Sequence, residues 1–448
     1  MADHAVSDHP AVQAQLERLA SLSPGRDILG LERITELLDR IGNPHLKIPP
    51  VFHVAGTNGK GSTCAYLRAA LEAEGHTVHV FTSPHLVRFN ERIRLAGVLI
   101  DDETLAEALK DVLDAGGDIN ASFFEVTAAA AFRLFADIPA DACVIEVGLG
   151  GRLDATNVLR APAACGIVSL GIDHEGFLLA PEEGVPEDPY CRIAFEKAGI
   201  AKPGSPLITQ RYRADMMRVI SDAARGAQAH LLTRGEAWDI VAYQGQLHYR
   251  DGAGKLELPL PRLPGMHQIG NLGVALAMLR HQNAVQIGES ALKAAPLWAQ
   301  WPARMQRLEG GPLNRLLPHR TLMLDGGHNP DAGQALAVTL KESALAADGV
   351  DLVTGMLANK DVLGFLEPLR PLLRSIRSLP VPGHEHHGPE VFAGIAEKWG
   401  LPHRAFETVT QALQDLALTA PDSDRTVLIA GTLYLAGAVL VANEQPPN

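Results

Sequence analysis

The stretch HVAGTNGKGST, residues 53–63, decides the fold of this chain. The apolar run VFHVA (51–55) leads into it, and the helix-like stretch CAYLRAALEAEG (64–75) follows it. A glycine turn between a strand and a helix lets backbone N–H groups converge on phosphate oxygens, and the helix N-terminus adds partial positive charge. Lys60 supplies a full charge for β- and γ-phosphates, and Ser62 or Thr63 can hold Mg²⁺. The stretch therefore predicts a phosphate site.

This loop departs from the usual pattern G-x-x-x-x-G-K-[ST]. Gly56 lies three residues before Gly59, and Gly61 separates the lysine from the hydroxyl residues. A glycine-rich turn with an incidental surface lysine is the alternative interpretation, which the strand before and the helix after make the weaker one. Phosphate binding alone does not distinguish a kinase, a motor or a ligase.

Apolar runs alternate with helix-like segments along most of the chain, and this pattern predicts parallel sheets covered on both faces. In the first part the runs are 51–55, 77–81, 142–148 and 164–170, with helix-like segments at 62–74, 102–115 and 124–136. After about residue 308 the runs are 320–327, 351–357, 375–381 and 426–432. Residues 237–260 alternate instead and contain the turn DGAG, so they predict a small antiparallel element.

The chain has 448 residues, too many for one ordinary core. We expect an α/β protein with a P-loop-type, mainly parallel sheet domain over residues 1–300. A linker at 301–307 then leads to a smaller Rossmann-like α/β domain at 308–448.

Composition limits the class of protein and its partners. The formal net charge of −13 argues against nonspecific nucleic-acid binding, although a few local cations can still hold an anionic ligand. Four cysteines without a C-x-x-C pair indicate free thiols in a reducing compartment. The start MADHAVSDHP has neither a basic nor an apolar signal region, and the apolar run 426–442 is broken by Gly431 and Gly437. We expect a cytoplasmic monomer that binds neither membrane nor nucleic acid.

Further motifs give the loop a family context. GTNGKGST resembles the loop of the Mur-type ATP-dependent amide ligases. The rest of the set, from about residue 25 to 437, resembles the folylpolyglutamate synthase/dihydrofolate synthase branch of that superfamily. Its motifs are FTSPHLVRFNERI (81–93), EVGLGGRLDATN (146–157), DHEGFL (173–178), EKAGIAKPG (196–204), HQIGN (267–271), DGGHNP (325–330) and GTLYLAG (431–437).

This resemblance implies ATP as co-substrate, Mg²⁺ as cofactor and a set of site residues. Glu146 ends an apolar strand at the edge where ligands bind in open α/β sheets, and a carboxylate there suits Mg²⁺. By resemblance, Ser83, Glu146 and His174 hold the metal, and the catalytic residues are Lys60, His174 and Lys197. The ATP-binding residues it implies are Thr57, Asn58, Gly59, Lys60, Gly61, Ser62, Asn271, Arg304, Asp325 and His328.

Lys197 and the pterin residues also depend on the resemblance. The position of Lys197 on a predicted helix indicates, by itself, an ordinary solvated lysine. The family resemblance implies instead an N6-carboxylysine, formed with CO₂, which turns a cation into a metal-binding anion. A flat pterin suits an aromatic ring and a carboxylate. The pterin residues implied are Leu29, Phe124, Leu153, Asp154 and Ala155, with a core role for Phe124 as the alternative.

Two features depart from the family, and the roles of a histidine-rich loop and of His328 stay open. The segment 176–192 is longer and richer in proline than the family leads us to expect, and Ala303 stands where a glycine usually precedes the arginine. GHEHH (383–387) fits a solvated loop better than a metal patch, because its spacing offers no closed four-ligand site. His328 either lies near phosphate or caps its turn.

The activity predicted is ATP-dependent addition of L-glutamate to dihydropteroate, to (poly)glutamylated tetrahydrofolate, or to both, through an acyl phosphate. The alternatives are a peptidoglycan-type Mur ligase, a P-loop ATPase or phosphotransferase, and a nucleotide-binding regulatory module. Amine-independent ATP turnover would indicate the ATPase, and a UDP-sugar requirement the peptidoglycan enzyme.

Overall fold

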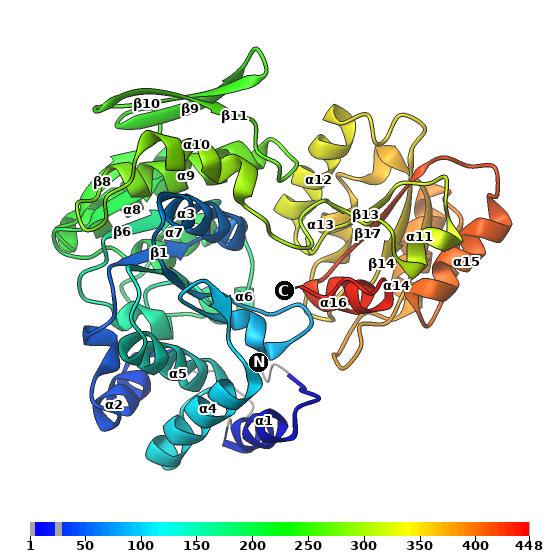
Figure 1. The fold of residues 1–448 in the computed structure, drawn as a ribbon. Coiled ribbons are helices and arrows are strands. Elements are labelled where there is room, and N and C mark those ends of the chain that lie inside the picture. Colours follow the sequence, from blue (N-terminus) through cyan, green and yellow to red (C-terminus); the bar gives the residue numbers. More distant parts are fainter. Residues whose placement is uncertain (1–4, 23–28, 448) are drawn as a thin grey trace. The chain divides into compact units, whose positions relative to one another are not determined.

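The computed structural model describes residues 5–22 and 29–447. The chain divides into two compact units (Figure 1). The first runs to Arg262 and includes Gln268–Gln300, and the second contains Leu263–His267 and continues from Trp301. The segment 301–307, expected as a linker, lies in the second unit, where Gln306 and Arg307 form strand β12.

The first unit is built on a mainly parallel sheet, as its apolar runs predict. Its central strand β1 is buried at every position, which is typical of a parallel strand covered on both faces. At one edge, β3 pairs antiparallel with both β2 and β4, whereas the other pairings of this sheet are parallel. In spatial order the strands are β4 (Val98–Leu99), β3 (Ile93–Leu95), β2 (Val78–Phe81), β5 (Ala142–Glu146), β1 (Val51–Ala55), β6 (Ala164–Ile167), β7 (Pro206–Thr209) and β8 (His230–Thr233).

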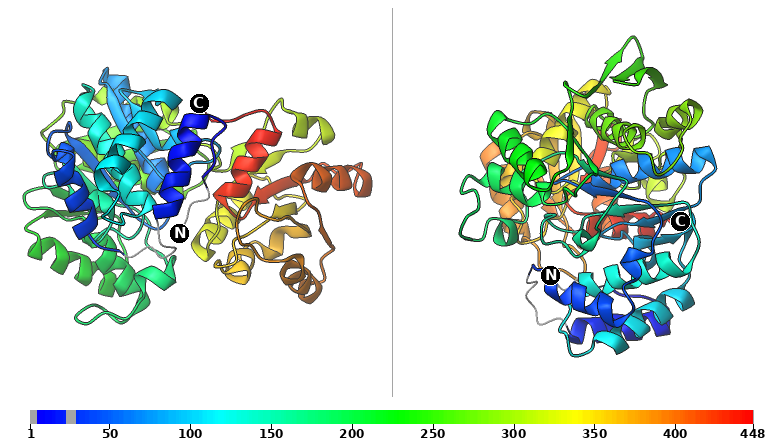
Figure 2. Two further views of the ribbon diagram at one scale, coloured as in Figure 1. Left: turned by 90° about the horizontal axis from the view of Figure 1, so that it is seen from below. Right: turned by 90° about the vertical axis from the view of Figure 1, so that its left-hand side faces the viewer.

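Helices cover both faces of this sheet (Figures 1 and 2). They are α1 (Pro10–Leu22), α2 (Glu32–Arg40), α3 (Lys60–Glu74), α4 (Asp102–Gly116), α5 (Phe123–Asp137), α6 (Glu175–Leu178), α7 (Pro189–Ala198), α8 (Ala214–Gly226), α9 (His267–Arg280) and α10 (Glu289–Trp298). Short 3-10 turns occur at η1 (Pro44–Leu46), η2 (Phe89–Arg92) and η3 (Ala155–Val158). The helices expected at 62–74, 102–115 and 124–136 correspond to α3, α4 and α5 and are confirmed.

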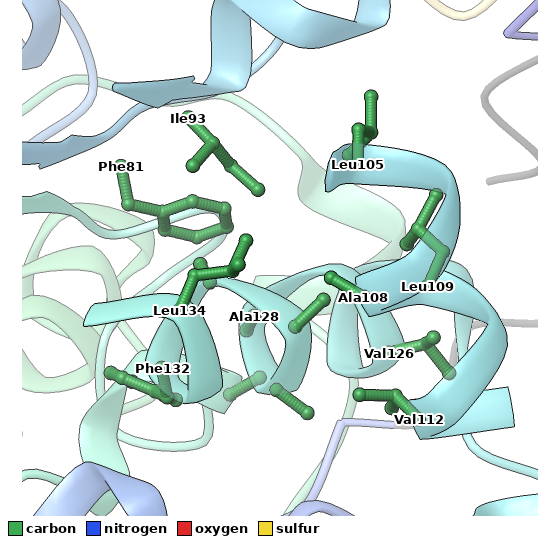
Figure 3. Close-up of a cluster of buried hydrophobic side chains, with 14 of the residues drawn as sticks. Phe81, Ile93, Leu105, Ala108, Leu109, Val112, Val126, Ala128, Phe132 and Leu134 are labelled. Atoms are coloured by element: carbon green, nitrogen blue, oxygen red, sulfur yellow. The ribbon is translucent and has the colours of Figure 1, made fainter. Parts of the chain in front are cut away.

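A large apolar cluster joins the sheet to α4 and α5 (Figure 3). Phe81 and Ile93 come from the strands, Leu134 comes from α5, and Leu109 comes from α4. All four side chains are at least nine-tenths buried, so the cluster fixes α5 against the strands. Because α5 begins at Phe123, this packing also fixes Phe124, which the sequence assigns to the pterin site.

The expected antiparallel element is confirmed as a separate sheet of β9 (Trp238–Tyr243), β10 (Gln246–Asp251) and β11 (Gly254–Pro259). Its turn pairs Asp251 with Gly254, as the DGAG sequence predicts. In Figure 2 this ribbon (green) stands out at the top of the right-hand view. Arg280 of α9 anchors it by donating to the Asp251 carboxylate at 2.7 Å.

The second unit contains another mainly parallel sheet flanked by helices. In spatial order its strands are β12 (Gln306–Arg307), β13 (Leu322–Leu324), β17 (Thr426–Ala430), β14 (Val350–Thr354), β15 (Leu373–Ser378) and β16 (His403–Ala405). Its helices are α11 (Pro312–Leu316), α12 (Pro330–Glu342), α13 (Val362–Leu366), α14 (Pro389–Trp399), α15 (Val409–Thr419) and α16 (Leu433–Ala442), with the 3-10 turn η4 (Arg370–Leu372).

The apolar run 426–442 is the strand β17, a turn at Gly431, and the helix α16, as expected. Within the described residues, no helix is both long enough and apolar enough to cross a membrane. The cysteines are free, and Cys64, Cys143 and Cys165 are buried. Both units are therefore α/β, as the alternation of apolar runs predicts.

Candidate active site

The glycine turn after β1 is held in place by the segment that follows β6. The backbone N–H of Thr57 donates to the Ser169 carbonyl at 2.7 Å, and the Thr57 hydroxyl donates to the Gly171 carbonyl at 2.7 Å. The backbone N–H of Asn58 donates to the Ser169 hydroxyl at 3.1 Å. Gly59 is the N-cap residue of α3 and has a φ of 86°, in the left-handed region that favours glycine.

Asn271 of α9 packs against this turn from the other side. A Cβ at Gly59 would lie 2.4 Å from the Asn271 side-chain oxygen, so position 59 has no room for a larger residue. Gln268, which the sequence analysis did not single out, connects two predicted residues. Its side chain donates to the Ser62 hydroxyl at 3.3 Å and accepts from the Asn271 amide at 3.2 Å.

Lys60, Glu146 and Ser83 lie together at the carboxyl edge of the sheet. The Lys60 ammonium is 3.9 Å from the Glu146 carboxylate and donates to the Thr57 carbonyl at 3.3 Å. The backbone N–H of Ser83 donates to the other Glu146 oxygen at 3.3 Å. Strands β1, β2 and β5 are parallel neighbours, so the residues that end them meet at one edge.

A small hollow opens beside this group. Lys60 and Lys197 both line it. The remaining lining residues are Gly56, Thr57, Gly148, Leu149, Gly150, Asp173, His174 and Leu178. His174, a predicted catalytic and metal residue, thus lies at the same hollow as the glycine turn, with a φ of 53° that marks a constrained backbone.

Lys197 is a buried cation at this hollow and not the solvated lysine that its helical position alone indicates. Its side chain donates to the Gly56 carbonyl at 3.0 Å, and only 4% of the residue is exposed. Burial, and then the charge of Lys60, lower the pKa of Lys197 from 10.5 to about 7. A large share of this amine is therefore neutral and nucleophilic at physiological pH.

The donor set at the sheet edge fits Mg²⁺. Glu146 is 4% exposed and offers hard carboxylate oxygens, and Ser83 lies in hydrogen-bond contact with it. His174 offers a nitrogen, which Mg²⁺ prefers less than oxygen. Asp173 adds a further carboxylate at the hollow. The sequence analysis missed Asp173, although its position directly before His174 in DHEGFL was a usable signal.

The predicted pterin residues come from α5 and from the loop that leads into η3. Phe124 is half-buried, and its ring lies against Gly148, where a Cβ would be 2.4 Å from the ring. Ala155 is buried and Leu153 is half-buried. Leu29 is half-buried just before α2, which packs against both α5 and η3.

Both carboxylate oxygens of Asp154 accept hydrogen bonds from backbone N–H groups. One oxygen accepts from the backbone N–H of Leu149 at 2.8 Å, and the other accepts from the backbone N–H of Thr156 at 3.0 Å. Only 2% of Asp154 is exposed. This carboxylate therefore organises its own loop, whatever further contact it makes with a substrate.

The unusual segment 176–192 contributes an ion-pair cluster beside the site. Glu182 pairs with Arg152 at 2.6 Å and with Arg192 at 2.8 Å. Both arginines also pair with Glu196, at 2.9 and 3.0 Å. The cluster ties the loop that carries Asp154 to helix α7, which carries Lys197.

The second unit carries its predicted nucleotide residues on loops at the strand ends. The Asp325 carboxylate accepts from the backbone N–H groups of Met305 and Gly327, both at 2.7 Å. Arg304 lies between Ala303 and Met305, whose φ values of 54° and 43° are strained for residues with a side chain. His328 contacts the Gly326 carbonyl at 2.9 Å.

The GHEHH loop belongs to the same unit and makes ordinary contacts. His384 stacks on Tyr434 with ring centroids 3.8 Å apart, and His387 contacts the Lys360 carbonyl at 2.8 Å. Residues 5–22 and 29–447 contain one group of three acidic, histidine or cysteine side chains that lie close enough to share an ion, and this group is not in the GHEHH loop. It consists of Asp188, Cys191 and Asp215.

Comparisons with known proteins place the chain among folate-related synthases. The chain is 34% identical over 419 residues to the dihydrofolate synthase/folylpolyglutamate synthase of Escherichia coli, covering 92% of this chain and 90% of the relative. It is 30% identical to the folylpolyglutamate synthase of Lacticaseibacillus casei (91% and 92% covered). It is 31% identical to the dihydrofolate synthetase of Saccharomyces cerevisiae (92% and 97% covered). No protein-family model matches the chain.

Solved structures agree in fold over nearly the whole chain. E. coli FolC in complex with DHPP and ADP has a TM-score of 0.82 at 30% identity, covering 98% of this chain and 99% of that one. A bifunctional folylpolyglutamate synthase/dihydrofolate synthase with Mn, AMPPNP and L-glutamate bound has a TM-score of 0.80 at 30% identity, covering 98% and 99%. The predicted Mur ligase architecture is confirmed, and the chain belongs to the folylpolyglutamate synthase/dihydrofolate synthase family.

Proposed function

We propose that this protein is an ATP-dependent amide ligase that adds L-glutamate to dihydropteroate, to tetrahydrofolate and its polyglutamates, or to both. One observation carries the proposal: the Lys60 ammonium, the Glu146 carboxylate and the buried Lys197 amine gather beside the glycine turn. A cation to hold phosphate and an acid to hold a metal ion suit carboxylate activation by ATP, and a carbamylated amine would add further oxygen ligands. The names of the relatives, dihydrofolate synthase/folylpolyglutamate synthase and dihydrofolate synthetase, support this assignment.

The reaction proceeds by activation and then by transfer. A carboxylate oxygen of the acid attacks the γ-phosphorus of ATP, the bond to the bridging oxygen breaks, and an acyl phosphate and ADP result. The amine of L-glutamate then attacks the acyl carbon, phosphate leaves, and the amine loses a proton. Lys60 offsets the charge that develops on the transferred phosphoryl group, while the backbone N–H groups of the turn orient it.

Mg²⁺ would be held by Glu146 and Ser83, with His174 as a further ligand. When bound, it shields the phosphate charge and polarises the γ-phosphoryl group. Lys197, once converted to a carbamate, would add two oxygens of the kind that Mg²⁺ prefers. Its low pKa supports this modification, because the neutral amine is the form that attacks CO₂.

We assign the pterin to Phe124, to Leu29 and to the loop of Leu153, Asp154 and Ala155. The half-buried Phe124 ring, held on Gly148, offers a face for stacking. We assign the nucleotide to the turn residues Thr57, Asn58, Gly59, Lys60, Gly61 and Ser62, to Asn271, and to Arg304, Asp325 and His328 of the second unit. The strained backbone around Arg304 supports a functional role there.

To test this proposal, the purified protein is incubated with Mg-ATP, labelled L-glutamate and either dihydropteroate or tetrahydrofolate, and labelled product is measured. Labelled product in one arm, or in both, identifies the acid. Lys60→Ala should abolish product, and Lys110→Ala, at an exposed lysine of α4, should leave it unchanged. Near-normal product in Lys60→Ala would refute the role of the turn. ATP hydrolysis that is independent of glutamate would indicate an ATPase, and product only with a UDP-sugar acid would indicate a peptidoglycan-type ligase.

We further propose that the enzyme acts as a cytoplasmic monomer on small molecules and does not bind nucleic acid. The net charge of −13 supports the absence of nonspecific nucleic-acid binding. Sedimentation of the purified chain, with and without DNA, tests both statements. Co-sedimentation with DNA, or a mass of twice 47.9 kDa, would contradict them.

A further inference from the structure

His53 is a polar residue in the centre of an otherwise apolar strand. It lies in β1, which pairs with β5 on one side and β6 on the other, and it is fully buried. Its Nε2 atom lies 2.8 Å from the hydroxyl oxygen of Thr156. Burying an imidazole in a sheet core costs free energy unless its polar atoms form hydrogen bonds. The hydrogen bond with Thr156 therefore points to a role for His53.

The contact continues from Thr156 to Asp154. The Thr156 hydroxyl lies 2.5 Å from an Asp154 oxygen, which also accepts from the Thr156 backbone N–H at 3.0 Å. The second Asp154 oxygen accepts from the backbone N–H of Leu149 at 2.8 Å. A continuous chain of buried groups thus runs from the core of β1 to the loop before η3.

Counting protons fixes the direction of this chain. Each Asp154 oxygen already accepts from a backbone N–H, and the Thr156 hydroxyl donates its single proton to this carboxylate. The Thr156 oxygen must then accept from His53, which therefore carries its proton on Nε2. Burial lowers the pKa of His53 to about 3, so the ring is neutral and has only that one proton. Its Nδ1 has no hydrogen-bond partner among the described residues, so the Thr156 contact is the ring's polar anchor.

Burial and hydrogen bonds act in opposite directions on Asp154. Burial raises the pKa of Asp154, and the donors from Thr156 and Leu149 oppose that rise. Losing the His53 donor would leave the Thr156 oxygen without its partner in the core. The Thr156 hydroxyl would then be less restrained, and the carboxylate would depend on its two backbone N–H donors alone.

The loop held by Asp154 touches both halves of the proposed site. Gly148 supports the Phe124 ring, with a Cβ position 2.4 Å from it. Gly148 and Leu149 also line the hollow that contains Lys60. A shift of the Asp154 carboxylate therefore moves the surface on which Phe124 rests.

We propose that His53 is a positioning residue for the pterin loop, residues 148–158: its Nε2–H fixes Thr156, and through it Asp154, in the orientation that shapes the acid-substrate pocket. This role rests on the proposed function. It gives a role to a core histidine that is not among the residues assigned to the pterin substrate or to the nucleotide.

The decisive pair of variants is His53→Gln and His53→Met. Gln and Met are close in shape, but only Gln keeps an N–H donor near the position of Nε2. His53→Met should raise KM for the pterin acid about 10-fold, the value of one lost hydrogen bond of about 1.4 kcal/mol, and KM for ATP should stay within about 2-fold. His53→Gln should stay within about 3-fold of the wild type for both substrates.

His79→Met is the matched control. His79 is equally buried in the neighbouring strand β2, and its ring contacts the Ile138 carbonyl and the Ala96 N–H, outside the loop. This variant should lose stability without a change in KM for the acid. Thr156→Val removes both links, and the double variant with His53→Met should be no worse than Thr156→Val alone.

Amide hydrogen exchange supplies a readout that needs no activity. The N–H groups of Leu149 and Thr156, which donate to Asp154, should exchange at least about 10-fold faster in His53→Met and near the wild-type rate in His53→Gln. Equal effects of Met and Gln, or equal rises in both KM values, would overturn the inference. If the wild-type protein does not ligate glutamate, the proposed function is refuted. The exchange rates would still decide the role of His53.

Discussion

Lys197 should titrate near neutral pH, because burial and the nearby charge of Lys60 both disfavour its ammonium form. Its pKa of about 7, against an ordinary 10.5, leaves about half of the amine neutral at pH 7. An ordinary lysine is neutral in only about one molecule in 3,000 at that pH. The perturbation that tests the cause is Lys60→Met. Removing the second positive charge should raise the pKa of Lys197, but to below 10.5, since burial is the larger cause and remains.

Competitive labelling with trace acetic anhydride measures this titration, since only neutral amines react. The protein is labelled from pH 5.5 to 10 in CO₂-free buffer with EDTA, and the Lys197 peptide is quantified against that of Lys110, which is exposed. The wild-type midpoint should lie near 7, and that of Lys60→Met should be higher. A wild-type midpoint near 10, or a midpoint unmoved by Lys60→Met, would refute the electrostatic reasoning.

The same titration has a consequence for stability. Between pH 7 and 10.5 the unfolded chain binds a proton at Lys197 that the folded chain lacks, so this group makes stability rise with pH in that window. The rise amounts to about 1.4 kcal/mol per pH unit, or about 5 kcal/mol in total. Lys197→Met should therefore stabilise helix α7 most below pH 7, and the gain should be about 3 kcal/mol smaller at pH 9. Amide exchange of α7 at the two pH values gives this difference.

Other outcomes follow from the local geometry. Gly59→Ala brings a methyl within 2.4 Å of the Asn271 side chain at a φ of 86°, so KM for ATP should rise about 10-fold or more. Gly75→Ala is the control, because Gly75 lies at the other end of α3 with a φ of 101° and open space around it. This variant should lose about 1 kcal/mol of stability in a denaturation measurement and leave KM for ATP unchanged. Glu146→Gln should need on the order of 10–100 times more Mg²⁺ for half-maximal activity, and an unchanged Mg²⁺ titration would contradict its role as ligand. Glu182→Gln should lower stability by about 1 kcal/mol, whereas Glu183→Gln, an exposed neighbour, should change it by less than about 0.5 kcal/mol; equal effects would show that the ion-pair cluster contributes nothing.

The sequence predicted those parts of the site whose chemistry is local. The turn at 56–62 lies between a buried strand and a helix, and both neighbours are visible as apolar patterns. The position of Glu146 at the edge of the sheet was predictable because it ends a strand, and parallel strands present their carboxyl ends at one edge. The alternation in 237–260 likewise specified an antiparallel sheet through its own period and turn.

What the sequence did not predict depends on contacts between distant segments. Gln268 reaches Ser62 only because the first turn of α9 lies beside the first turn of α3, and a glutamine inside a helical pattern carries no sign of that contact. Glu182 stands in a proline-rich stretch that reads as a loop, and its partner Arg152 is thirty positions away. The burial of Lys197 follows from the approach of α7 to the glycine turn, so its helical position indicated an ordinary solvated lysine.

Nucleotide and metal should act on Lys197 in opposite directions. A polyphosphate beside Lys60 adds negative charge to the hollow and favours the ammonium form, which raises the pKa of Lys197. A divalent cation near Glu146 adds positive charge and favours the neutral amine, the form that reacts with CO₂. Because the pKa is already about 7, a cation can at most about double the reactive fraction at pH 7, whereas a polyphosphate can lower it severalfold. In the labelling experiment, Mg²⁺ alone should therefore lower the Lys197 midpoint, and ATP with EDTA should raise it. Shifts of the same sign would mean that Lys197 senses a conformational change and not the charge in its hollow.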